Sequence, residues 1–460
     1  MKKKLYLIPL LILLLTLASC NVEKDKHVCE EHQSEWIDEV PFGCEEYGKQ
    51  IIKCTECNKI LNEQFITKDH ELIEEEIIKG TCTTNGVVKV TCKNCGITDQ
   101  YTKYYTGHEI GEVEVYRKPN NKVVGKRNIL CSKCNEVIKV QSFVDNGYFK
   151  HGKLSVSGAD LVNEDGEKVQ LFGLSTHGLQ WFGRYANFDT ICAIQEGFGI
   201  NIIRFALYTD ENGYCDGSES TKQQMLEDLK EGVDAATKLG LYVIIDWHMV
   251  GAENVKDKNP LTYLNESMEF FSYISEYYKD QDNILFEIMN EPNGSTTWSD
   301  CKKYAEKVIP VIREHSDGII LVGNPRWTAD LNSVMRNPLV GYENIMYTYH
   351  FYASDHGNTT QVVNAYKNGF PVFISEFGFM ESSGDGAISE NNGNRWKQIL
   401  DERNISYVAW NISNSAGSAS IFKMHSADMT DVSDENLKVW GIYLKNWYRE
   451  KSGLSKLIHD

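Results

Sequence analysis

The stretch Tyr242–His248, which reads YVIIDWH, indicates the fold of this chain. Its apolar run is typical of a strand buried on both faces, as strands are when helices cover a parallel sheet. The preceding segment, Gln223–Leu239, has one apolar helical face that carries Met225, Leu226, Leu229, Val233 and Ala236. A helix that leads into a doubly buried strand is the alternation expected of an α/β domain.

The same alternation extends over residues 153–460. Eight successive strand-and-helix units favour a (β/α)8 TIM barrel over a doubly wound sheet. No G-x-G-x-x-G motif follows the first strand to support a dinucleotide-binding fold. The predicted strands are Val169–Leu174, Asn201–Leu207, Leu241–Trp247, Ile284–Met289, Gly318–Val322, Ile345–His350, Pro371–Ser375 and Ser406–Trp410.

Polar and aromatic side chains stand where these strands end. They are Arg204, His248, Asn290, Glu291, His350, Tyr352, Glu376 and Trp410. The carboxyl ends of barrel strands meet at one face. We therefore expect these residues, which are far apart in sequence, to surround one cleft.

Two carboxyl groups across a cleft are what glycosidic cleavage requires, one protonated and one ionised. Glu291 needs a raised pKa to act as the acid, whereas Arg204 and Tyr352 would favour the charged form of Glu376. The amide of Asn290 and the two histidines are candidate hydrogen-bonding groups for a sugar or a carboxylate. A His₂-carboxylate metal centre is disfavoured because no H-E-x-x-H or similar spacing occurs.

Residues 153 to 445 resemble glycoside hydrolase family 5, and in particular the bacterial endo-β-1,4-glucanases. The resemblance rests on five stretches: LFGLSTHGLQW (Leu171–Trp181), YVIIDWH (Tyr242–His248), IMNEPNG (Ile288–Gly294), HFY (His350–Tyr352) and ISEFG (Ile374–Gly378).

This resemblance implies retaining double displacement on β-1,4-glucan without a cofactor, with Glu291 as acid/base and Glu376 as nucleophile. It further implies a supporting shell of Arg204, His248, Asn290, His350, Tyr352 and Trp410, and sugar contacts from His177, Trp181, Tyr208 and Trp327. Two alternatives stay open. The substrate could be mannan, mixed-linkage glucan or xyloglucan, or the chain could bind surface glycans without turnover.

Two departures from the family pattern bear on specificity. Phe377 follows Glu376 where relatives usually have Trp. After Trp410, the stretch Asn411–Gly417 (NISNSAG) stands where relatives often read S-L-S-D-K-x-E, whose Lys and Glu bind a distal glucose. The preference for sugars beyond the reacting unit is therefore open.

Residues 1–19 have the charged start, apolar run and small-residue end of a secretory signal. The apolar run is too short to span a bilayer. Because Leu17–Cys20 resembles a bacterial lipobox, we expect Cys20 to be lipidated and the chain to be an exported, membrane-anchored surface lipoprotein, with residues 20–26 as anchor and linker. The net charge of −18 argues against a nucleic-acid partner.

Residues 27–140 hold nine of the 13 cysteines in a repeated pattern. His32, Cys44, Cys54 and Cys57 recur 38 residues later as His70, Cys82, Cys92 and Cys95. A third copy has His108, Cys131 and Cys134, with Asn120 near the place of its first cysteine. We expect short strands around these residues.

A Cys₃His set with one C-x2-C pair fits structural zinc, with disulfides or plain thiols as alternatives. These units resemble zinc-ribbon-like modules of bacterial surface proteins, which suggests a spacer or a docking element for an unknown surface partner. Residues 141–152 are a predicted linker. Cys192, Cys215 and Cys301 are expected to be packing residues.

Overall fold

The computed structural model describes residues 36–40, 44, 48–53, 58, 60–66, 70–250 and 256–458. The expected signal peptide, Cys20, His32, Cys54 and Cys57 lie outside the described residues. The chain divides into two compact units, residues 1–108 and 109–460. Within the described ranges, no helix combines the length and apolar character needed to cross a membrane.

The first unit contains two antiparallel sheets of three strands each. The first consists of β1 (Ile37–Val40), β2 (Gly48–Lys53) and β3 (Ile60–Ile66), and the second of β4 (Leu72–Ile78), β5 (Gly86–Cys92) and β6 (Thr98–Lys103). Every residue of β4 and β6 is exposed. The short strands expected between the cysteines are confirmed, and these sheets have little hydrophobic core.

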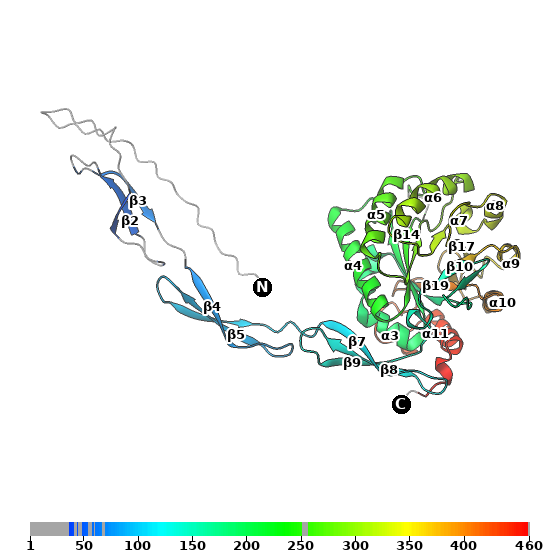
Figure 1. Ribbon diagram of the computed structural model, residues 1–460, viewed down its shortest axis with the longest axis horizontal. Coiled ribbons are helices and arrows are strands. Elements are labelled where there is room, and N and C mark those ends of the chain that lie inside the picture. Colours follow the sequence, from blue (N-terminus) through cyan, green and yellow to red (C-terminus); the bar gives the residue numbers. More distant parts are fainter. Residues whose placement is uncertain are drawn as a thin grey trace, which may run out of the picture. The chain divides into compact units, whose positions relative to one another are not determined.

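The second unit contains a closed barrel of parallel strands, which confirms the predicted fold (Figure 1). Its strands are β12 (Phe172–Thr176), β13 (Ile202–Tyr208), β14 (Tyr242–His248), β15 (Ile284–Glu287), β16 (Ile320–Val322), β17 (Ile345–Tyr352), β18 (Val372–Gly378) and β19 (Tyr407–Ile412). Pairing of Phe172 with Tyr407 and of Leu174 with Ala409 joins the last strand to the first.

Helices follow the strands around the outside of the barrel (Figure 1). The longer ones are α3 (Phe188–Phe198), α4 (Glu219–Lys238), α5 (Leu264–Tyr277), α6 (Trp298–Arg313), α9 (Thr360–Lys367), α10 (Glu390–Glu402) and α11 (Val439–Lys451). Short helices complete the set: α1 (Tyr148–His151), α2 (Leu179–Phe182), α7 (Pro325–Thr328) and α8 (Leu331–Arg336).

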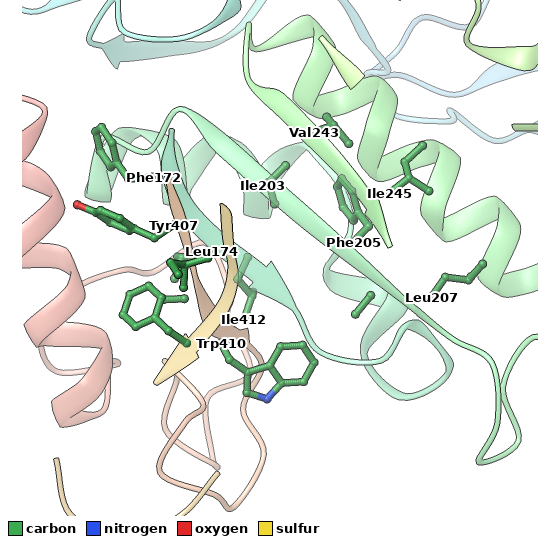
Figure 2. Close-up of a cluster of buried hydrophobic side chains, with 14 of the residues drawn as sticks. Phe172, Leu174, Ile203, Phe205, Leu207, Val243, Ile245, Tyr407, Trp410 and Ile412 are labelled. Carbon is green, nitrogen blue, oxygen red and sulfur yellow. The ribbon is translucent and has the colours of Figure 1, made fainter. Parts of the chain in front are cut away.

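Alternating residues along the barrel strands point to two separate hydrophobic cores, one between the strands and the helices and one inside the barrel. Ile203, Phe205 and Leu207 of β13 belong to the cluster that includes the helices (Figure 2). Ile202 and its neighbours in the other strands form a separate cluster inside the barrel. The hairpin β10 (Ser155–Ser157) and β11 (Asp160–Val162) adds Leu161 to this inner cluster. With both faces of each strand buried, polar groups at the strand ends gather at one open face.

A further antiparallel sheet, β7 (Ile110–Arg117), β8 (Gly125–Cys131) and β9 (Val137–Phe143), packs beside α3 (Figure 1). Arg127 of this sheet is buried and donates to the side chains of Gln141 and Gln195 and to the carbonyl of Leu239. The sheet of the third repeat therefore belongs to the same unit as the barrel.

Candidate active site

The strand-end residues predicted from the sequence surround one cavity of about 520 Å³. Six of the eight line it: His248, Glu291, His350, Tyr352, Glu376 and Trp410. Three of the predicted sugar contacts, His177, Tyr208 and Trp327, also line it, whereas Trp181 does not. Arg204 and Asn290 are fully buried beside these residues and are not among those that line the cavity. The expectation of a single cleft is confirmed.

Glu376, at the end of β18, is held at both carboxylate oxygens. The hydroxyl of Tyr352 donates to Oε1 at 2.8 Å, and Nη1 of Arg204 donates to Oε2 at 3.2 Å. Burial and the nearby charge of Glu376 raise the pKa of Tyr352 well above its ordinary value, so its hydroxyl keeps the proton that it donates. Both contacts stabilise negative charge on Glu376.

Glu291, which follows β15, lies in a different environment. Burial and the negative charge of Glu376 raise the pKa of Glu291, although a hydrogen bond from His350 opposes this rise. The raised pKa keeps a proton on Glu291 over a wider pH range. The surroundings of Glu291 are therefore those that the predicted acid requires.

A hydrogen-bonded chain supports Glu291. Nδ1 of His350 lies 2.9 Å from Oε1 of Glu291, and its Nε2 lies 2.9 Å from Oγ of Ser375. Ser375 in turn donates to Oε1 of Glu287 at 2.6 Å. Burial alone would lower the pKa of His350, but the surrounding carboxyl groups raise it to about 9. Both ring nitrogens are then donors.

Oxygen atoms of Glu291 and Glu376 and a ring nitrogen of His350 all lie within 4.8 Å of one another. Retaining glycosidases place their carboxyl groups about 5–5.5 Å apart, whereas inverting enzymes need about 6.5–9.5 Å to admit a water molecule. The close approach of one oxygen from each carboxyl group favours the shorter spacing.

Arg204 lies within a set of buried charges that the sequence reasoning only partly found. Its Nε donates to Glu287 at 2.7 Å, and its Nη2 lies 2.9 Å from Asp246. Although burial opposes it, the charges of Asp246, Glu287 and Glu376 raise the pKa of Arg204. The missed residues, Asp246 and Glu287, were recognisable as single acidic residues within otherwise apolar strands.

Two histidines that line the cavity differ in the role of Nε2, which is an acceptor in His248 and a donor in His177. Burial and the charge of Arg204 lower the pKa of His248 well below its ordinary value, and its Nδ1 lies 2.6 Å from Asp246. Nδ1 therefore carries the hydrogen, and Nε2 accepts. His177 accepts from the backbone N–H of Gly178 at Nδ1, and burial lowers its pKa to about 4. Its Nε2 is therefore a donor.

Asn290 supports the site from behind. Its Oδ1 accepts from Nη2 of Arg204 at 2.6 Å, and its Nδ2 donates to the carbonyl of Met249 at 3.0 Å. The same Nδ2 lies 3.4 Å from Nε2 of His248. The amide of Asn290, a candidate partner for a sugar hydroxyl, is therefore hydrogen-bonded to other groups of the protein.

Among the aromatic candidates, Trp410 and Tyr208 are buried, whereas Trp181 and Trp327 are exposed. Trp410 stacks on His248 with an angle of 11° between the rings. Trp181 contacts Tyr208 edge to face and is 42% exposed, and Trp327 is 54% exposed. Such indole faces suit the apolar faces of sugar rings.

Trp327 stands on an unusual turn after β16. Arg326, Trp327 and Thr328 all adopt positive φ angles, of 62°, 53° and 55°. The turn is fixed by a hydrogen bond from the backbone N–H of Trp327 to the carbonyl of Pro292 and by one from Thr328 to the carbonyl of Asn290. Backbone strain of this kind persists only where the surroundings enforce it.

The departures from the family pattern have structural explanations. Phe377 is fully buried and stacks on Phe351, because successive strand residues point to opposite sides and Glu376 faces the cleft. Lys438 donates to the carbonyls of Ser415 and Gly417, so protein groups hold this loop.

The candidate metal ligands of the first unit are grouped differently from the expectation. Cys44 lies with His70, Cys92 and Cys95, and Cys82 does not belong to this set. The reason is strand length: Cys82 precedes β5 and Cys92 ends it, and seven extended residues span about 23 Å. The grouping of His70 and Cys92 with Cys82 of the same repeat is wrong.

The barrel and its paired carboxyl groups define a glycoside hydrolase. A match to the family described as cellulase (glycosyl hydrolase family 5) covers residues 162–416. The chain belongs to this family and is an enzyme of the cellulase type.

Curated relatives and solved structures agree with this assignment. Endoglucanase A of Butyrivibrio fibrisolvens is 41% identical over 64% of this chain and 68% of its own length. An endoglucanase of Clostridium saccharobutylicum is 35% identical over 64% of each protein. The chain thus spans about two-thirds of the length of these relatives.

Among solved structures, cellulase Cel5C_n matches 66% of this chain and 95% of its own, with 35% identity and a TM-score of 0.61. The catalytic domain of Thermobifida fusca endoglucanase Cel5A, solved with cellotetraose, is matched over its whole length with 33% identity and a TM-score of 0.61.

Proposed function

We propose that this protein is a retaining endo-glycosidase that hydrolyses internal β-1,4-glucosidic bonds of cellulose or related β-glucans. The observation that carries the proposal is the separation of Glu291 and Glu376, whose carboxylate oxygens approach within 4.8 Å across an open cavity. Such a close approach favours the shorter, retaining spacing over the wider one that admits a water molecule. The endoglucanase relatives support the choice of β-glucan.

In the first step, a carboxylate oxygen of Glu376 attacks the anomeric carbon while Glu291 gives its proton to the departing glycosidic oxygen. In the second step, Glu291 takes a proton from water, and the resulting hydroxyl displaces Glu376 from the sugar. Water is consumed and both carboxyl groups return to their starting states. The two inversions leave the product in the β configuration.

Stereochemistry tests this mechanism directly. Proton NMR of an early digest of cello-oligosaccharides should show β-anomers before mutarotation, and α-anomers would contradict the proposal. Glu291→Gln and Glu376→Gln should each lower kcat by at least about 10²–10⁴-fold, whereas Glu276→Gln, on the exposed face of α5, should not.

Azide separates the roles of the two carboxyl groups. With an aryl cellobioside, Glu291→Ala should regain turnover when azide replaces water and should give a β-glycosyl azide. Glu376→Ala should instead give the α-glycosyl azide, since azide then attacks the sugar directly. If Glu291→Ala gave the α-glycosyl azide and Glu376→Ala the β-glycosyl azide, the two residues would have each other's roles.

A panel of cellulose, mixed-linkage glucan, xyloglucan and mannan, applied to the full chain, measures the substrate preference. If kcat/KM were highest on mannan, the substrate would be mannan and not a β-1,4-glucan. Tight binding to any of these polymers without release of reducing ends would support a glycan-binding protein that lacks turnover.

We also propose that the chain is exported and anchored through lipid on Cys20, as its signal-like start suggests. In cells fed a labelled fatty acid, the protein should carry the label in the membrane fraction, and Cys20→Ala should carry none. Equal labelling of both forms would contradict the anchor.

A further inference from the structure

Four potential metal ligands converge in the first unit. One donor atom from each of Cys44, His70, Cys92 and Cys95 lies within 4.8 Å of the others. Sγ of Cys44 is 3.4 Å from Sγ of Cys92, and Sγ of Cys95 is 3.5 Å from Nδ1 of His70. A tetrahedral zinc ion with Zn–S bonds of about 2.3 Å sets its ligand atoms roughly 3.5–3.8 Å apart. The observed distances are close to this separation.

The register of the second sheet brings three of these ligands together. Leu72, near the start of β4, pairs with Cys92 at the end of β5. His70 precedes β4, and Cys95 lies in the turn that follows β5, so both lie at this end of the sheet. Cys44 comes from the segment between β1 and β2 of the first sheet. The set therefore combines the ligands of two consecutive repeats.

The turn after β5 has the hydrogen bonds of a thiolate ligand. The backbone N–H groups of Asn94 and Cys95 are directed at the sulfur of Cys92. Gly96, with a φ of 74°, closes this turn, and its N–H donates to the carbonyl of Cys92. Donors that surround a ligating sulfur orient it and stabilise its negative charge.

We propose that Cys44, His70, Cys92 and Cys95 bind one zinc ion that joins the two sheets of the first unit. The three thiols lose their protons to solvent on binding, and His70 binds as the neutral ring. A disulfide between Cys44 and Cys92 would need a sulfur–sulfur distance of about 2.05 Å and would give His70 and Cys95 no function. With so little hydrophobic core in these sheets, a metal supplies the missing stability.

The sequence repeats this ligand pattern. Cys44, His70, Cys92 and Cys95 are separated by 25, 21 and 2 residues, and Cys82, His108, Cys131 and Cys134 by 25, 22 and 2.

Metal analysis of the full purified chain tests the proposal. Zinc content per chain should fall by one equivalent in Cys44→Ala and by one in Cys95→Ala, and the double variant should lose the same single equivalent. Cys215→Ala, within the barrel, is the matched control and should keep the wild-type zinc content. Cobalt(II) in place of zinc should show thiolate charge-transfer absorption that weakens in Cys44→Ala.

Three outcomes would overturn this assignment. The first is loss of two equivalents in the double variant, which would place Cys44 and Cys95 in separate sites. The second is an unchanged zinc content in Cys44→Ala. The third is a wild-type chain that carries no zinc and whose mass shows a disulfide between Cys44 and Cys92.

Discussion

Nδ1 of His350 lies 2.9 Å from Oε1 of Glu291, and this contact opposes the burial that raises the pKa of the carboxyl group. His350 therefore helps to set the pH at which Glu291 loses the proton that it must donate. The alkaline limb of a pH–rate profile for kcat/KM reports this loss.

Substitution of His350 should move this limb in a direction that the structure determines. In His350→Gln the amide nitrogen can still reach Ser375, but the donor to Glu291 is lost, so the pKa of Glu291 and the alkaline limb should rise. His350→Asn keeps a donor at the Nδ1 position and should shift the limb less. A limb that moves to lower pH in His350→Gln would contradict this role.

Tyr352→Phe should slow the second chemical step more than the first. Glu376 leaves the sugar as an anion in that step, and the Tyr352 hydroxyl is one of its two donors. A hydrogen bond to a charged group contributes about 1.5–3 kcal/mol, so we expect a loss of roughly 10–100-fold. The measurement is a pre-steady-state burst of phenol from an aryl cellobioside, which should become more pronounced.

Tyr349→Phe is the matched control, because Tyr349 lies in the same strand and its ring lies near Trp396 outside the barrel. Its kinetics should equal those of the wild type. A Tyr352→Phe variant without enhanced burst and with unchanged kcat would refute the proposed role of this hydroxyl.

Arg204→Met should destabilise the barrel severely. Arg204 is fully buried among Asp246, Glu287 and Glu376, and its removal leaves these carboxyl groups without their cation. Removal of one partner from a buried ion pair costs about 3–5 kcal/mol. Denaturant unfolding of this variant should show that loss, while Arg395→Met, on the exposed surface of α10, should change stability by less than about 0.5 kcal/mol.

Arg127→Met should weaken the attachment of the β7–β9 sheet without affecting catalysis. Gln141, Gln195 and the carbonyl of Leu239 would lose a buried donor, which costs about 1–3 kcal/mol. Tm should fall while kcat/KM stays at the wild-type value. Lys118→Met, at an exposed position, should leave Tm unchanged, and an unaltered Tm in Arg127→Met would show that this contact adds no stability.

The barrel was predictable because doubly buried strands are continuous apolar runs, and all eight predicted strands overlap the observed ones. The cleft was predictable as well, because polar residues at the ends of apolar strands are rarely buried in a core. Asp246, Glu287 and Ser375 were missed because they lie within strands, and only barrel closure brings their side chains together. The ligand grouping failed for a similar reason: a sequence period does not reveal which residues share one end of a sheet.

The left-handed turn at Arg326, Trp327 and Thr328 has a consequence for heat tolerance. Each such residue costs about 1–2 kcal/mol, so the rim of the cleft holds free energy that a glycine at position 326 would release. The hydrogen bonds of Trp327 and Thr328 would still hold the turn in such a variant, so its Tm should rise while the indole keeps its place beside the cavity.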